Sequence, residues 1–211
     1  AYPARIGLYP GVSCMFNCQF CGRREGTSFS NNLADSSVEL FSSLLDEHIK
    51  QPHHQKIIRL SGGLEPTTNK NIGKIIKSIE SRRLKPQMYT NGFLMTEKWL
   101  EKNEDILALD SIRFSVYGHD YKTYYHTTGH IKGVTALDNI KNFIDHLDFY
   151  QSPMNVGLNY VILSGKLDEF DSFIDYVKIL NTTTGGLDWI SLREDSSQNL
   201  WGLNEIGRAH V

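Results

Sequence analysis

Residues 56–79 read KIIRL-SGGLEP-TTNK-NIGKIIKSI: a β-rich run, a glycine turn and an amphipathic segment in succession. The run Lys56–Leu60 is short and rich in isoleucine, which is typical of a buried strand. Beyond the turn, isoleucines recur at the spacing of one helix face, at Ile72, Ile75, Ile76 and Ile79. The stretch therefore predicts one strand–helix unit, with the turn at the carboxyl end of the strand.

The same alternation extends along the chain. Further β-rich runs occupy 5–9, 87–90, 111–117, 156–163 and 187–192. Stripes of helical period lie between them, over 38–49, 96–100, 137–147 and 170–177, and Asp35-Ser36-Ser37 offers N-cap chemistry for the first. Strict alternation predicts an α/β fold with a parallel sheet. About six units are visible, fewer than the eight of a closed TIM barrel. The pattern alone leaves both a doubly wound sheet and a partial barrel open.

Composition and charge exclude several classes of protein. The chain has 211 residues, with 22 basic and 24 acidic side chains, so its net charge of -2 gives no reason to expect nucleic acid as a partner. No apolar run approaches the ~20 residues of a membrane span, and no signal-peptide pattern opens the chain. We therefore expect a cytoplasmic protein with no membrane partner. The length suits one domain over 1–211, and the missing initial Met leaves a truncation at one or both ends open.

All three cysteines fall in one short segment, directly after the first β-rich run. The segment reads CMFNCQFC over residues 14–21, which is the spacing C-x3-C-x2-C. A structural zinc site uses four protein ligands, and the chain has no second cysteine pair. Three thiolates can instead hold a 4Fe–4S cluster and leave one iron open to a small-molecule ligand. The plain alternative is a group of inert buried thiols, which this spacing disfavours.

Cys14, Cys18 and Cys21 resemble the signature of the radical S-adenosylmethionine (SAM) superfamily. The resemblance covers essentially the whole chain and implies a partial (β/α)6 TIM-like barrel with parallel strands, with 1–211 as the radical SAM core domain. It also implies that the three cysteines hold a 4Fe–4S cluster whose open iron chelates SAM. One electron, from a reductase such as flavodoxin or ferredoxin, then cleaves SAM to a 5′-deoxyadenosyl radical that abstracts a substrate hydrogen. Phe20 takes the family's aromatic position near adenine, which is compatible with a core role.

The turn after the second strand adds to the resemblance. Residues 61–66, SGGLEP, are similar to the family's Gly-Gly-Glu-Pro segment, with Leu64 inserted relative to the commonest form. Glycines there let backbone carbonyls approach the ammonium group of SAM. The resemblance thus implies that Gly62, Gly63 and Glu65 lie at the cofactor. The alternative is an ordinary turn in which Pro66 opens a helix.

Four further polar residues at later strands are implied as cofactor ligands. Asn91 follows the third strand, and Ser115 lies late in the fourth, where it would bond ribose or carboxylate oxygens. Asn159 in the fifth strand resembles a family position near the nucleoside; the alternative is a buried amide satisfied by a neighbouring strand. Arg193 ends the sixth run, where its guanidinium could bind a carboxylate or phosphate. A salt bridge from Arg193 to Glu65 or Glu194 is the alternative.

The substrate is a finer inference. SGGLEP followed by TTN at 67–69, with SLRED at 191–195, resembles the sugar-nucleotide branch of the superfamily, which includes a TDP-4-amino-4,6-dideoxyglucose deaminase. That likeness implies a nucleotide-activated aminosugar as the small-molecule substrate and a carbon–nitrogen lyase reaction. The stretch 117–126 carries four tyrosines and two histidines, which would suit sugar hydroxyls and stacking, or form a plain surface loop.

Other functions stay open at this point. A radical SAM peptide or RNA modifier is the alternative enzyme, and a non-catalytic iron–sulfur or zinc-binding module is the alternative of another class. The spacing does not choose a general base among His119, Glu65, Asp120 and Glu194.

Overall fold

Six parallel strands form one sheet in the computed structural model, which describes residues 6–21, 28–162, 169–181 and 186–194. The strands pair in chain order, each parallel to the next, as expected for successive strand–helix units. Their bounds are β1 Ile6–Leu8, β2 Ile57–Leu60, β3 Lys85–Thr90, β4 Ser111–Val116, β5 Asn155–Ile162 and β6 Trp189–Glu194. The predicted α/β fold with a parallel sheet is confirmed. Because the strands follow one another in chain order, with no reversal of the order, the sheet is the predicted partial barrel and not a doubly wound sheet; the carboxyl ends of its strands form the mouth of the barrel.

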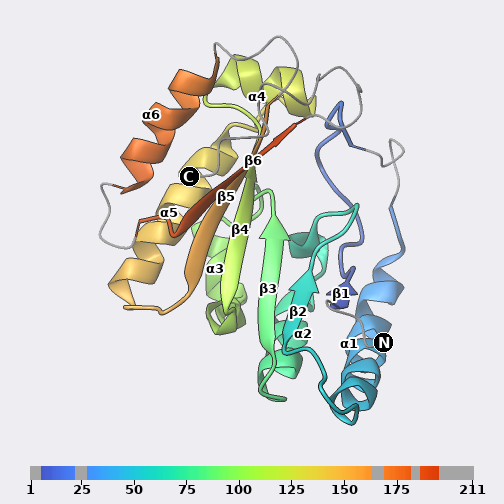
Figure 1. Ribbon diagram of the computed structural model, residues 1–211. Helices are drawn as coiled ribbons and strands as arrows, with labels where there is room; N and C mark the ends of the chain where they lie inside the picture. The colour runs from blue at the N-terminus through green and yellow to red at the C-terminus, as the bar shows by residue number, and fades with distance from the viewer. Residues whose placement is uncertain (1–5, 22–27, 163–168, 182–185, 195–211) are drawn as a thin grey trace.

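Most helices lie along the outer side of the sheet, whose inner side faces the viewer in Figure 1, and α4 at Tyr121–Thr128 lies above it. The helices are α1 Asn31–Ile49, α2 Ile72–Glu80, α3 Glu97–Lys102, α4 Tyr121–Thr128, α5 Thr135–Phe149 and α6 Phe170–Asn181, with short 3-10 helices at Pro66–Thr68 and Glu104–Ala108. None of the helices within the described ranges is both long and apolar enough to cross a membrane.

The two faces of the sheet carry different residues because strand side chains alternate. On β2, Ile58 and Leu60 are fully buried in the core beneath the helices, whereas Arg59 between them is only half-buried. The same alternation separates Met88 of β3 from Tyr89 and continues along β4, whereas residues 156–160 of β5 are buried on both faces. The hydrophobic core therefore lies on the outer face, and the inner face is left for polar and aromatic side chains.

Several predicted boundaries need correction. The last strand, expected at 187–192, is β6 at Trp189–Glu194, and residue 163 of the predicted fifth strand lies outside the described residues. The first helix begins at Asn31, where Ser30 is the N-cap and its side chain accepts a hydrogen bond from Asn32 N–H (3.2 Å). Asp35-Ser36-Ser37 therefore lie inside α1 and do not cap it. The predicted apolar stripe begins at Val38, seven residues after the start of α1, so the sequence pattern did not predict the first two turns of the helix.

The stretch 117–126, expected to be a loop, is mostly helical, since α4 covers 121–128. Asp120 and Thr123 form a capping box at its start. Polar groups dominate its buried face, so the sequence shows no apolar stripe there. Figure 1 shows α4 above the carboxyl ends of the later strands, where it borders the predicted site.

Candidate active site at the carboxyl ends of the strands

The cysteine segment follows β1 and lies against the end of α4. The Asn17 N–H donates to the Thr128 carbonyl (2.8 Å), and the Gln19 N–H donates to the Thr127 carbonyl (3.2 Å). Carbonyls at a helix end have no partner within their own helix, so they can accept these bonds. The middle of the cysteine segment is thereby fixed to the last turn of α4.

The cysteines themselves form no disulfide. Cys14 and Cys18 are half-buried and pack against the core, while Cys21 is exposed. Within the described ranges, no three Cys, His, Asp or Glu side chains are gathered tightly enough to enclose a metal ion. The donor set nevertheless fits an iron–sulfur cluster better than a structural zinc ion, because it consists of three thiols on one short loop and lacks a fourth cysteine.

The turn after β2 is tied directly to the start of the cysteine segment. The Glu65 N–H donates to the Ser13 carbonyl (2.9 Å), and the Thr68 hydroxyl accepts from the Val12 N–H (3.1 Å). A Cβ at Gly11 would lie 2.8 Å from the Glu65 carbonyl oxygen, so only glycine permits this contact. The two loops expected to hold the cluster and SAM thus form one bonded unit.

Glu65 is buried at the centre of this unit. Its Oε1 accepts from the Thr67 N–H (3.1 Å), the Thr67 hydroxyl (2.7 Å) and the Thr90 hydroxyl (2.5 Å). Its Oε2 accepts from the Asn91 N–H (2.8 Å). Burial raises the pKa of Glu65 above its ordinary value, while these hydrogen bonds act in the opposite direction. The carboxyl group expected at the cofactor therefore joins the β2 and β3 loops, and it makes no salt bridge with Arg193.

The two glycines of the turn have different surroundings. Gly62 has a φ of +130°, and a Cβ there would lie 2.2 Å from Cδ1 of Tyr9, so a side chain is excluded. Gly63 has no atom within 4 Å of the position its Cβ would take. Both are exposed, and the open space beside Gly63 leaves its backbone accessible to a ligand.

Asn91 links the end of β3 to the cysteine segment. Its Nδ2 lies 3.4 Å from Met15 Sδ and 3.9 Å from Cys14 Sγ, while its Oδ1 accepts from the Phe93 N–H (3.0 Å). The Oδ1 bond fixes the orientation of the amide so that its N–H groups face sulfur. Asn91 thus lies beside Cys14 and directs a donor toward its sulfur.

Asn159 lies in register with Ser115 on β4 and with Ser191 on β6, on the inner face of the sheet. It is buried, and its Oδ1 has no hydrogen-bond partner in the structure. The alternative of an amide satisfied by a neighbouring strand is therefore wrong for this oxygen. Buried polar atoms are rarely left without a partner, so this acceptor is suited to a ligand.

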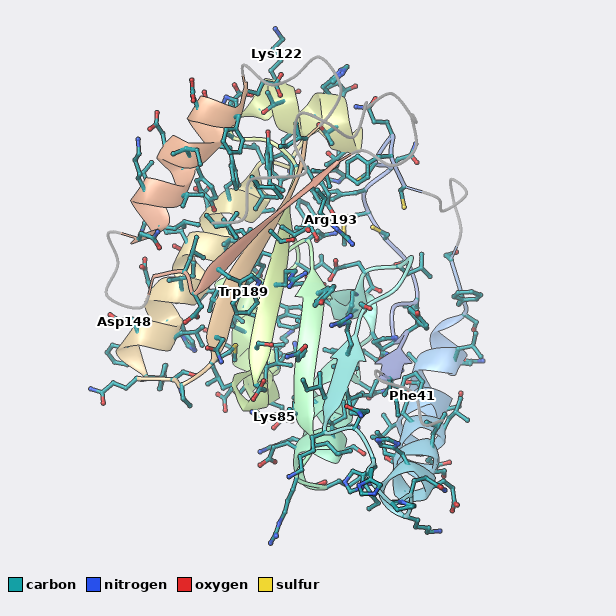
Figure 2. All side chains as sticks on the ribbon, viewed as in Figure 1. Phe41, Lys85, Lys122, Asp148, Trp189 and Arg193 are labelled. Atoms are coloured by element: carbon teal, nitrogen blue, oxygen red, sulfur yellow. The ribbon has the colours of Figure 1, made fainter. Side chains whose placement is uncertain are left out.

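Arg193 lies two residues beyond Ser191 on β6, opposite Val161 of β5. Its side chain is exposed, and Figure 2 shows it on the open side of the sheet. The alternative salt bridge to Glu65 is not formed, because the described partners of the Glu65 carboxylate are Thr67, Thr90 and Asn91. The side chain of Glu194 lies outside what the structure describes. The guanidinium is therefore available at the mouth of the barrel.

Aromatic rings pack beneath and beside the cysteine segment. The Phe16 ring is buried against those of Phe93 (5.4 Å between centroids) and Tyr117 (5.8 Å). Phe20 is half-buried and also contacts Tyr117 (5.7 Å). This packing is compatible with both roles expected of Phe20, and it identifies Phe16 as the ring that anchors the segment.

Tyr117 was expected only as part of a stacking loop. Burial raises the pKa of Tyr117 well above its ordinary value, and the nearby Cys18 thiol acts in the same direction. Its hydroxyl is hydrogen-bonded to Ser115 and stays protonated at neutral pH. Tyr117 therefore joins the cysteine segment to the row of Ser115, Asn159 and Ser191 on neighbouring strands. Its position directly after a strand could have indicated this role.

Other members of the 117–126 stretch are used by the fold. Tyr124 is fully buried, so it does not form part of a stacking surface. The Asp120 carboxylate accepts from the Thr123 N–H (2.8 Å), and this bond lowers the pKa of Asp120. His119 Nε2 lies 3.3 Å from Asp120. Among the proposed general bases, Glu65 and Asp120 are thus already engaged by protein donors.

A cavity of about 640 Å³ opens on another side of the cysteine segment. Cys14 and Met15 line it together with Thr67, Thr68 and Trp99. It does not reach Ser115, Asn159 or Arg193. Cys14 therefore has one side toward this cavity, away from the row of Ser115, Asn159 and Ser191.

Comparisons with known proteins agree with this arrangement. Residues 8–177 match the model of a family described as the Radical SAM superfamily. The chain is 33% identical over 199 residues to dTDP-4-amino-4,6-dideoxy-D-glucose ammonia-lyase of Streptomyces venezuelae, covering 93% of this chain and 41% of that protein. It is 29% identical over 158 residues to a probable GTP 3′,8-cyclase of Thermococcus kodakarensis, covering 74% and 46%. The chain spans less than half the length of these curated relatives.

A solved structure shares the fold. Streptococcus suis SuiB bound to S-adenosylmethionine superposes with a TM-score of 0.65 at 15% identity, covering 94% of this chain and 40% of SuiB. The family model matches residues 8–177, and this match agrees with the three-cysteine segment and with the six-stranded parallel sheet. The chain belongs to the radical SAM superfamily, which implies a 4Fe–4S cluster and SAM as its cofactors.

Proposed function

We propose that residues 1–211 form the core of a radical SAM carbon–nitrogen lyase whose substrate is a nucleotide-activated aminosugar. The observation that carries this proposal is the 33% identity to the ammonia-lyase named above, because it extends over 93% of the chain. An electron-donating partner such as flavodoxin or ferredoxin would supply the reductant. The unpartnered Oδ1 of Asn159 at the barrel mouth supports a ligand on the inner face.

Cys14, Cys18 and Cys21 would hold the cluster, which together with SAM supplies the radical that removes hydrogen from the substrate. The other residues bind and orient. Asn159 and Ser115 offer an acceptor and a hydroxyl on neighbouring strands, while the backbone at Gly63 is open to an ammonium group. The rings around Phe16 keep water away from the inner side of the cysteine segment.

The substrate proposal is tested with protein reconstituted anaerobically with iron and sulfide. It is incubated with SAM, dithionite and either dTDP- or UDP-linked 4-amino sugars, and 5′-deoxyadenosine and ammonia are quantified. We expect a dTDP-aminosugar to increase both products. No increase with any nucleotide sugar would remove the substrate proposal. SAM binding without any release of methionine or 5′-deoxyadenosine would identify a non-catalytic module instead.

Cys14→Ala tests the cluster assignment. Two thiolates cannot hold three irons, so we expect the variant to lose the visible absorbance of the cluster and SAM cleavage together. Asn17→Ala is the matched control, because its exposed side chain lies between the cysteines on the same loop. Normal iron content and full activity in Cys14→Ala would contradict the assignment.

A further inference from the structure

Two arginines share one aromatic ring on the inner face of the sheet. The guanidinium carbon of Arg59, on β2, lies 5.0 Å from the ring centroid of Tyr89 on β3. That of Arg113, on β4, lies 4.7 Å from the same centroid and 5.8 Å from the Trp189 ring on β6. The cluster thus draws one side chain from each of four strands, and it takes no part in the cofactor site described above.

The two cations have no counter-ion within the described part of the chain. Neither arginine forms a salt bridge there, and at the amino end of the sheet Asp110 is already paired with Lys85 (2.8 Å). Figure 2 shows Lys85 at the lower end of the sheet, far below Arg193. Buried or half-buried cations are normally paired, because water no longer screens them fully. A negatively charged group that binds between Arg59 and Arg113 would therefore be favoured.

The unsatisfied atoms of the cluster are all donors. The Nε atoms of Arg59 and Arg113 and the Nε1 of Trp189 are buried and have no hydrogen-bond partner in the structure. Each carries one N–H and accepts nothing in these side chains. A ligand that satisfies them must supply several acceptors, and the two positive charges require it to be an anion.

The position of Trp189 depends on the residue opposite it on β5. Gly157 is in register with both Arg113 and Trp189. A Cβ at Gly157 would lie 2.1 Å from Cε2 of Trp189, so the indole lies directly over the glycine. The absence of a side chain on β5 thus lets Trp189 reach toward Arg113 across the intervening strand.

The cluster lies one layer deeper in the barrel than the expected cofactor ligands. Arg113 precedes Ser115 by two residues on β4, and Gly157 precedes Asn159 by two on β5. Two residues correspond to about 6.6 Å along a strand. A substrate that presents its reacting carbon at the barrel mouth would therefore place an attached group beside the arginines.

We propose that Arg59, Arg113 and Trp189, arranged around Tyr89, form the subsite for the diphosphate of the nucleotide-activated substrate. This inference rests on the proposed function. Planar guanidiniums match phosphate oxygens two at a time, and the indole N–H adds a third donor. A carboxylate has the same acceptor chemistry, so the experiment must separate the two anions.

The test measures binding of dTDP, inorganic pyrophosphate and citrate to the reconstituted holoprotein by calorimetry. Wild type should bind dTDP, with pyrophosphate competing and citrate not competing. Arg59→Met and Arg113→Met should each weaken dTDP binding by about 10- to 100-fold, the range of a lost charge-assisted hydrogen bond. Arg83→Met is the matched control, because it removes the same charge from an exposed turn, and it should change binding less than about 2-fold.

Arg59→Lys and Arg113→Lys keep the charge and remove the planar fork, so an intermediate loss of affinity is expected. Thermal denaturation and cluster absorbance show that each variant is folded.

Three outcomes would overturn the subsite. They are unchanged dTDP binding in folded Arg59→Met and Arg113→Met, absence of dTDP binding to wild type, and displacement of dTDP by citrate. If a dTDP-aminosugar stimulates 5′-deoxyadenosine formation but its KM is unchanged in these variants, the subsite is wrong and the proposed function stands. If no nucleotide sugar stimulates wild type, the proposed function fails.

Discussion

Glu65 shows how one buried residue can hold three loops of a candidate site together. Its two carboxyl oxygens receive four hydrogen bonds from Thr67, Thr90 and Asn91, and its own N–H is bonded to Ser13. The loops after β1, β2 and β3 are therefore held together around a single buried side chain. We regard Glu65 as a positioning residue for the cysteine segment and for Asn91.

Glu65→Gln should lower the free energy of unfolding by about 1–3 kcal/mol. In the variant, an NH₂ group replaces one carboxyl oxygen and can no longer accept the hydrogen bond from the Thr90 hydroxyl or from the Asn91 N–H. The control is Glu80→Gln, whose exposed side chain lies 3.7 Å from Lys77 and should matter little. Urea denaturation measures both. Equal stabilities of the two variants would contradict the role given to Glu65.

The pKa of Glu65 adds a pH dependence. Burial raises this pKa above 4.5, so the folded protein binds the proton more tightly than the unfolded chain does. The associated stability is fully present below pH 4.5 and is lost as pH rises through the raised pKa. The free energy of unfolding of wild type, relative to that of Glu65→Gln, should therefore fall over this interval. A relative rise would show that the hydrogen bonds outweigh burial.

Asn159→Ala separates a binding role from a structural one. The Oδ1 atom has no hydrogen-bond partner among the described residues, so its removal should cost little stability. If SAM or substrate supplies the partner, the affinity for that ligand should fall by about 10-fold. Equilibrium dialysis with SAM and thermal denaturation give the two readouts, and Asn155→Ala at the lower, exposed end of β5 is the control. Lost stability with unchanged affinities would identify a merely structural amide.

At the scale of elements, α4 matters because of what its last turn holds. Its capping box at Asp120 and Thr123 fixes its start, and the carbonyls of Thr127 and Thr128 bind the middle of the cysteine segment. A Cβ at Gly118 would lie 2.4 Å from the Thr123 hydroxyl, so the turn before α4 also requires glycine. The helix thus connects the end of β4 to the predicted cluster.

Asp120→Ala should destabilise α4 by about 0.5–2 kcal/mol, the range for a lost N-cap, and should also speed the loss of iron from the reconstituted cluster. Ser30→Ala is the matched control, since it removes the N-cap of α1 without contacting the cysteine segment. Chelator-induced bleaching of the cluster measures iron loss. Similar bleaching rates in the two variants would argue against the coupling between α4 and the cluster.

At the scale of the whole molecule, the two faces of the sheet have different roles: the outer face holds the hydrophobic core, and the inner face holds the polar and aromatic groups that can bind a ligand. The outer face of β2–β5 buries Ile58, Met88, Phe114 and Leu158 under the helices. The inner face carries the Arg59–Tyr89–Arg113–Trp189 cluster and, one layer above it, the row around Asn159. A ligand can therefore bind inside the barrel without disturbing the hydrophobic core.

Gly157→Ala tests how the last strand joins this arrangement. The added methyl group would overlap the Trp189 indole, with a separation of 2.1 Å from Cε2, so the indole or β6 must move. We expect a loss of about 1–3 kcal/mol in the free energy of unfolding. Gly63→Ala is the control, because no atom lies within 4 Å of its added methyl group. Urea denaturation decides, and equal stability of both variants would show that Trp189 is not held over Gly157.

The sequence by itself determined the α/β alternation, the parallel sheet and the three-cysteine segment. Hydrophobic period and motif spacing are local properties, so Ile72–Ile79 and Cys14–Cys21 could be interpreted without knowing their neighbours. Helix α4 was not predicted because its buried face is mostly polar, so its sequence shows no apolar stripe with a helical period.

Only the tertiary structure decided which polar side chains have partners. Thr90 reaches Glu65 across 25 residues, whereas the buried Oδ1 of Asn159 has no hydrogen-bond partner in the described part of the chain. The arginines on either side of Tyr89 come from strands that are separated by more than fifty residues in the chain. Whether a polar atom is satisfied depends on the strand or loop that lies opposite it, and strand order and register set that neighbour.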